Sequence, residues 1–213
     1  MTLSDSLSSD SKISTSRRAL LRALAIAPIA ASAASPWNGT PASLHQCYED
    51  EPATLARTKE GRSISRFRYH NAERRWMLTD IVAFPESRFT NPALHFAGFV
   101  CQQALCAYLL DVGFADEWNA QHIRQDIAKA LTYANACGFG HDCPDMARLA
   151  AVLSPYWKWG YHYDDWEEDR PLTGGFIPTT IKPLVRALLD RVHDVTGHPR
   201  PKGCQRRPQE ARS

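Results

Sequence analysis

The chain has 213 residues, with 25 Lys and Arg against 23 Asp and Glu, and 44% of its residues are hydrophobic. This length and apolar content suit a single domain with a buried core. Residues 34–197 hold 16 basic against 20 acidic residues, which argues against a folded nucleic-acid-binding domain, because such a domain normally has a basic face. Six cysteines are too few for a fold held together mainly by disulfides.

Residues 1–33 have the composition of an export leader. A polar, Ser-rich start leads to the string SRRALLR at residues 16–22, and an Ala-rich apolar segment follows. The sequence ASA at residues 31–33 fits the small-residue pattern of a signal peptidase site. The string resembles the bacterial twin-arginine (Tat) signal, S-R-R-x-F-L-K, with Leu20 in place of Phe and Arg22 in place of Lys.

The resemblance covers residues 12–35 only. It implies a bacterial source, export of the folded protein by the Tat machinery through Arg17 and Arg18, and a periplasmic or secreted location. Two other interpretations stay open: an uncleaved anchor, and an N-terminal helix of a cytoplasmic protein. The apolar stretch is about a dozen residues long and contains Pro28, whereas about 20 apolar residues are needed to span a bilayer.

The rest of the chain predicts an all-α fold. Residues 34–62 are expected to be a linker, and residues 63–197 a single bundle of about five helices, each with apolar residues at helical spacing. The helices are expected to start at a capping residue or a proline and to stop at a proline or glycine. Their expected starts are Asn71, Asn91, Asp116, Pro144 and Thr180, and their expected ends are Pro85, Gly113, Gly138, Pro155 and Gly197.

Three further segments complete this organisation. Residues 64–69 are predicted to form one strand without an obvious partner. The helix from Asn91 contains no charge from Phe89 to Leu110, but Gln102 and Gln103 make a membrane span unfavourable. We therefore expect this helix at the centre of the bundle. Residues 198–213 lack apolar side chains and are expected to form a disordered basic tail.

Cys137, His141 and Cys143 lie within seven residues, in the predicted loop between the third and fourth helices. Three interpretations stay open. The residues hold zinc together with another cysteine, Cys137 and Cys143 form a disulfide in an exported protein, or both cysteines are free thiols. The spacing C-x3-H-x-C matches no known zinc-finger pattern.

Residues 154–176 combine aromatic and acidic side chains, including Trp157, Trp159, Trp166, Asp164 and Asp165. Flat rings beside carboxylates suit the binding of a sugar or a cation. In the alternative interpretation the rings cover the end of the bundle and the acids face solvent. Because neighbouring rings cannot all face the core, we predict that at least one tryptophan is partly exposed.

The chain carries no phosphate-binding loop, dinucleotide fingerprint, nucleophile elbow or zinc-protease motif. We therefore expect an exported helical protein with a binding or structural role at the cell envelope. One alternative is a glycan-directed envelope enzyme that uses acids of residues 164–169, which would need two carboxylates about 5–10 Å apart. The other is a cytoplasmic accessory protein of a mobile element with a false export signal. No catalytic residue is assigned.

Overall fold

The computed structural model describes residues 40–81, 90–160 and 171–203. Within these ranges the chain forms seven α-helices and no strand, which confirms the all-α prediction with more helices than expected. The helices are α2 (Thr40–Tyr48), α3 (Lys59–Ile81), α4 (Thr90–Val112), α5 (Asp116–Trp118), α6 (Ile127–Ala136), α7 (Pro144–Leu153) and α8 (Pro178–Thr196). A π-helical turn, η2 (Asn119–Ile123), follows α5, and a 3-10 turn, η3 (Tyr156–Trp159), follows α7.

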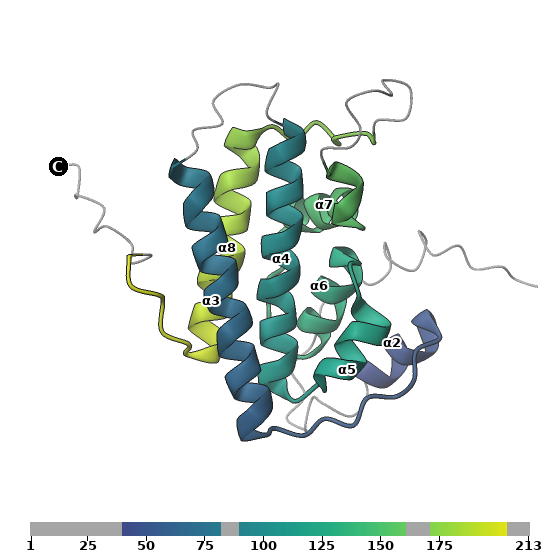
Figure 1. Cartoon of the computed structure of the whole chain (residues 1–213). Helices are drawn as coiled ribbons and strands as arrows, with labels where there is room; N and C mark the ends of the chain where they lie inside the picture. The colour runs from purple at the N-terminus through teal and green to yellow at the C-terminus, as the bar shows by residue number, and fades with distance from the viewer. Residues whose placement is uncertain (1–39, 82–89, 161–170, 204–213) are drawn as a thin grey trace, which may run out of the picture. The chain divides into compact units, whose positions relative to one another are not determined.

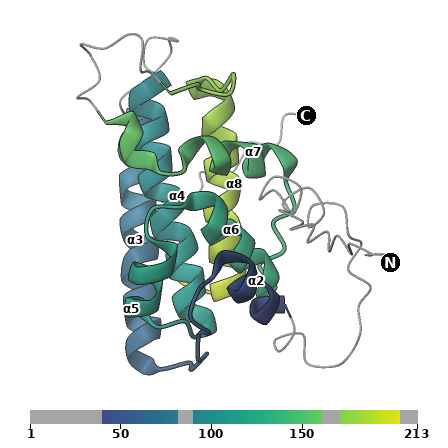
Figure 2. The ribbon, with the colours of Figure 1, turned by 90° about the vertical axis from the view of Figure 1, so that its right-hand side faces the viewer.

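Helix α4 is the centre of the bundle, as predicted. It lies beside α3 and α8, and α6 and α7 pack against it from another side (Figures 1 and 2). By length and composition α4 could cross a membrane, but 72% of its most apolar window is buried in the domain. Its small residues let neighbouring helices approach closely: a Cβ added at Gly98 would lie 2.1 Å from the Cβ of Tyr156 on η3.

The predicted strand at residues 64–69 is wrong, because these residues lie inside α3. The buried positions Ser65, Tyr69, Ala72 and Trp76 follow each other at three- and four-residue steps, which is helical spacing. Apolar and basic residues alternate around Phe67, as they would along a strand with one buried face, but Phe67 is 65% exposed. The helix also starts twelve residues earlier than predicted, at Lys59.

The predicted third helix, from Asp116 to Gly138, is two helices in the structure. The chain leaves η2 at Arg124, which has a φ of 50°, and resumes as α6. Asp126 rather than Asp116 provides a side-chain cap, since its carboxylate accepts the backbone N–H of Lys129 at 2.9 Å. Asp116 instead forms an ion pair with Arg68 of α3 at 2.6 Å.

The two predicted non-helical segments are also partly ordered. Residues 34–62 contain α2 and the start of α3, and the beginning of the expected tail packs on the bundle. His198 is fully buried there, and Arg200 forms a 2.7 Å ion pair with Asp190 of α8. The leader, including Arg17 and Arg18, and residues 204–213 lie outside the described residues.

Candidate functional site

Residues 51–57, which we call the wall segment, cross from α2 to the start of α3 and are held by three hydrogen bonds. The indole Nε1 of Trp118 donates to the carbonyl oxygen of Glu51 at 2.9 Å. The backbone N–H of Ala53 donates to Nε2 of His45 at 3.3 Å. The N–H of Ala56 donates to the carbonyl oxygen of Gly113 at 2.9 Å. The segment is therefore fixed to α2, to α5 and to the end of α4.

A glycine is required at position 113, where the wall segment contacts the end of α4. Its φ is +117°, a conformation that residues with a side chain rarely adopt. A Cβ at this position would lie 2.9 Å from the backbone nitrogen of Ala56. The glycine that was expected to end the helix therefore also lets the wall segment approach α4.

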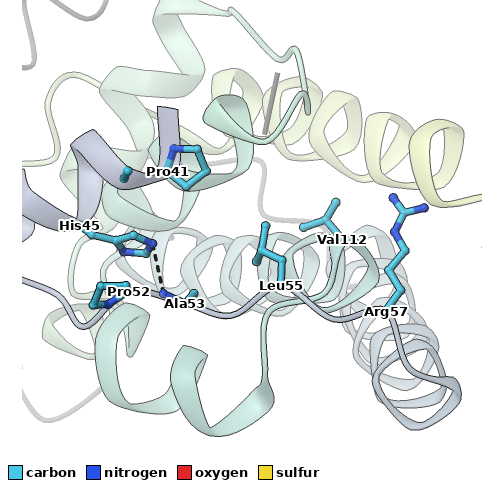
Figure 3. A pocket seen from close by; sticks show the side chains of 8 residues that line it. Pro41, His45, Pro52, Ala53, Leu55, Arg57 and Val112 are labelled. Carbon is cyan, nitrogen blue, oxygen red and sulfur yellow. Dashed lines mark hydrogen bonds between the residues drawn. The ribbon is translucent and has the colours of Figure 1, made fainter. Parts of the chain in front are cut away.

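A pocket of about 660 Å³ lies between α2, the wall segment and the end of α4 (Figure 3). In Figure 3 His45 lies at one end and Arg57 at the other, with Leu55 and Val112 between them. The volume is in the range of small-molecule sites, which are mostly apolar with a few placed polar groups. Polar and apolar atoms both contribute to the surface of the pocket, and six of its described lining residues have apolar side chains: Pro41, Ala42, Pro52, Ala53, Leu55 and Val112.

Behind the pocket lies a set of polar side chains that we call the His45 network: His45, Asp50, His122, Lys129 and Tyr133. The Tyr133 hydroxyl donates to Asp50 Oδ2 at 2.7 Å and lies 3.1 Å from Nδ1 of His45. Because Nε2 of His45 accepts the N–H of Ala53, its ring proton is on Nδ1 and is donated to Tyr133. The chain of hydrogen bonds thus runs from the wall segment through His45 and Tyr133 to Asp50.

Asp50 is the negative centre of the His45 network. Its Oδ1 lies 2.7 Å from Lys129 Nζ and 3.3 Å from His122 Nδ1, and its side chain is 6% exposed. Burial lowers the pKa of His45, and although Asp50 opposes this effect, His122 and Lys129 add to it. Burial and the bond to Asp50 raise the pKa of Tyr133, so its hydroxyl stays protonated. Nε2 of His122 is buried without a hydrogen-bond partner, but the bonds among His45, Tyr133, Asp50 and Lys129 are of the kind that fixes a local structure.

The pocket's chemistry follows from these bonds. His45 is neutral, and both of its ring nitrogens are bonded to protein groups. It therefore offers a bound molecule neither a free proton nor a free lone pair, which a general acid or base must have. Arg57 is the one other lining residue with an ionisable side chain. This arrangement suits binding better than proton transfer.

A Ser–His–Asp set also occurs, but its hydrogen bonds run in the wrong direction for catalysis. Ser65 Oγ donates to the carbonyl oxygen of Ala107 at 2.6 Å, so its contact with Nε2 of His198 at 2.7 Å must have the histidine as donor. A nucleophilic serine needs the histidine as acceptor of its proton. Ser65 and His198 are fully buried, and Asp111 lies 3.7 Å from Nε2 of His198. The set fixes the residues after α8 to α3 and α4.

The predicted aromatic site is only partly described. Trp157 is 54% exposed, whereas Trp159 is 3% exposed and donates its Nε1–H to the carbonyl oxygen of Val152 at 3.2 Å. The prediction that at least one ring is exposed is therefore confirmed. Asp164, Asp165 and Trp166 lie outside the described residues, and so do all acids of the glycan-directed alternative.

The three interpretations of Cys137, His141 and Cys143 differ in how the two cysteines are bonded. In the structure Cys137 and Cys143 are free thiols, as in the third interpretation, and no disulfide joins them. Cys137 is 1% exposed, and burial raises the pKa of its thiol to about 11. The described part of the chain contains no group of three metal-ligating His, Cys, Asp or Glu side chains, so Cys137, His141 and Cys143 are not gathered into a metal site there.

Sequence reasoning missed the pocket because it treated residues 34–62 as a linker. A usable signal was present in that stretch. Pro41 and Pro52 lie on either side of His45, and Gly113 and Trp118 come close together later in the chain. The contacts that assemble the pocket include pairs far apart in the sequence, such as Trp118 and Glu51, which are 67 positions apart, and no local pattern predicts such contacts.

Comparisons of the chain with protein-family models, with curated proteins and with solved structures find no match.

Proposed function

We propose that this protein is an exported protein of the bacterial cell envelope that binds a small organic molecule in the pocket beside His45. The observation that carries the binding role is the state of His45, the histidine at the opposite end of the pocket from Arg57. Both of its ring nitrogens are used within the protein. The residue therefore serves to hold the wall segment in place, and the pocket serves to contain a ligand rather than to convert it.

The apolar lining supports a ligand with substantial apolar surface. Removing such surface from water contributes about 25 cal/mol per Å². The three hydrogen bonds of the wall segment hold it in place, which favours a pocket that is formed before the ligand arrives. A preformed site loses less conformational entropy when a ligand binds.

The binding role can be tested with 1-octanol, a neutral apolar probe, by isothermal titration calorimetry on the full chain. We expect saturable binding to one site. Ala42 lines the pocket and is exposed on α2, so Ala42→Trp should fill the pocket and abolish binding. Gln46 is exposed on the same helix without lining the pocket, so Gln46→Trp is the matched control and should bind normally. Absence of binding to the unchanged protein, or equal effects of both variants, would contradict the proposal.

The proposed export of the protein rests on the twin-arginine-like sequence in residues 1–33. The double variant Arg17→Lys and Arg18→Lys keeps both charges but removes the planar guanidinium pair. We expect the variant to stay in the cytoplasm in a bacterium with a Tat system, as measured by cell fractionation. The matched control is Arg74→Lys with Arg75→Lys, which alters an arginine pair outside the leader and should be exported normally. Normal export of the leader variant would show that the twin-arginine interpretation is wrong.

A further inference from the structure

The charge of the pocket indicates what kind of ligand it takes. None of the described residues that line it is Asp or Glu, and Arg57 is exposed. Within the described residues Arg57 makes no hydrogen bond and no ion pair. A guanidinium that faces an apolar pocket without a carboxylate partner is suited to bind an anionic ligand group.

The carboxylates in the surrounding structure do not neutralise Arg57. Asp50 is engaged by Lys129 at 2.7 Å and by Tyr133 at 2.7 Å, behind the ring of His45. Asp111, next to the lining residue Val112, forms a 2.7 Å ion pair with Arg62. Glu51 belongs to the wall segment but is exposed and does not line the pocket. The charge of Arg57 therefore stays available.

At the other end of the pocket, the described side chains offer no free hydrogen-bonding group to a ligand. Nε2 of His45 accepts from Ala53 and Nδ1 donates to Tyr133, so the ring presents only carbon atoms for further contact. Its neighbours there, Pro41 and Pro52, have no polar side-chain atoms (Figure 3). A ligand that fits both ends is charged at one end and apolar at the other.

We propose that the pocket binds an amphipathic carboxylate. The carboxylate pairs with the guanidinium of Arg57, and an aliphatic or aromatic body lies along Leu55 and Val112 toward Pro52 and His45. A carboxylate fits better than a phosphate dianion, because one guanidinium supplies two parallel donors for two oxygens and the pocket offers no further charge. This inference rests on the proposed function and specifies the ligand class of the same site.

The experiment compares octanoate with 1-octanol, which have the same number of carbon atoms but differ in charge. Calorimetry on the full chain at pH 7.5 should show octanoate binding at least tenfold more tightly than 1-octanol, a difference of about 1.4 kcal/mol. Arg57→Gln should remove this advantage and leave the affinity for 1-octanol unchanged. Arg74 is exposed on α3 and outside the pocket, so Arg74→Gln is the matched control and should change neither affinity.

The outcomes separate this inference from the proposed function. If 1-octanol binds and Ala42→Trp blocks it, but octanoate binds no more tightly or Arg57→Gln has no effect, the carboxylate assignment is wrong and the binding pocket stands. If neither probe binds, both are wrong. Because Arg57 is exposed, the variant should unfold at the same temperature as the unchanged protein.

Discussion

Replacing Tyr133 with phenylalanine tests whether the His45 network fixes the local structure behind the pocket. The substitution deletes one oxygen atom from a fully buried side chain and leaves the ring that packs against Trp118. The hydroxyl donates to the Asp50 carboxylate at 2.7 Å and accepts from His45 at 3.1 Å. Both interactions are lost together, and Nδ1 of His45 keeps a buried proton without an acceptor.

The magnitude follows from these two bonds. A hydrogen bond to a charged group contributes about 1.5–3 kcal/mol to stability, and a neutral one about 0.5–1.5 kcal/mol. Asp50 keeps its contacts with Lys129 and His122, so no carboxylate is left unpaired. We therefore expect Tyr133→Phe to lower the free energy of unfolding by about 3 kcal/mol.

The assay is urea unfolding of the full chain at pH 7.5, followed by circular dichroism. Tyr108→Phe is the matched control, because Tyr108 is also buried but its hydroxyl makes one neutral bond, to the carbonyl oxygen of Cys137 at 2.7 Å. That variant should lose about 1 kcal/mol. Equal losses for the two variants would refute the argument that the network contributes more than an ordinary buried hydrogen bond.

Three further predictions concern other parts of the domain. Gly113→Ala should lower the free energy of unfolding by about 2 kcal/mol and weaken 1-octanol binding. Gly175 also has a positive φ (+79°), but a Cβ there meets no other atom, so Gly175→Ala should leave binding intact. Burial lowers the pKa of His198 to about 4. As the pH falls, the unfolded state therefore takes up a proton before the folded state does, and the free energy of unfolding should fall by about 2 kcal/mol between pH 7.5 and pH 5. A His198→Gln variant that keeps this full pH dependence would contradict the prediction. Trp157→Ala should leave the unfolding temperature nearly unchanged because the ring is 54% exposed, whereas Trp159→Ala should remove about 3 kcal/mol or more, and equal losses would refute the distinction.

The helical class was predictable from the sequence because it depends on local periodicity. The start of α7 at Pro144 was predicted from the proline itself, since proline suits the first turn of a helix. The end of α8 was predicted from Gly197, which adopts the left-handed conformation expected after a helix, with a φ of 66°. The burial of α4 was predicted from its lack of charge.

Helix boundaries that depend on tertiary contacts were not predictable. The break after η2 occurs at Arg124, which carries no intrinsic signal for a positive φ, and its carbonyl oxygen accepts from Gln102 of α4 at 2.5 Å. The sequence predicts Thr180 as the start of α8, whereas it is the third residue of that helix, and its hydroxyl accepts the backbone N–H of Ile177 at 3.0 Å. A capping residue in sequence fixes a helix start only to within a turn.

The candidate site was less predictable than the fold. His45 and Tyr133 are 88 positions apart, and neither belongs to a motif. Trp157 and Trp159 stand out in the sequence because aromatic residues near acids form a visible local pattern. A pocket assembled from proline, alanine and one histidine has no such pattern, so it became apparent only when the fold had brought the wall segment beside α2.

The central claim is that the pocket beside His45 is the ligand-binding site of this protein. Its most direct test is a two-dimensional NMR titration of the full chain with octanoate. We predict progressive shifts of the Leu55 and Val112 methyl groups, the Ala53 amide and the Arg57 Nε–H, with the indole signal of Trp157 unchanged. Unchanged signals from the pocket residues, or shifts centred on Trp157, would contradict the account.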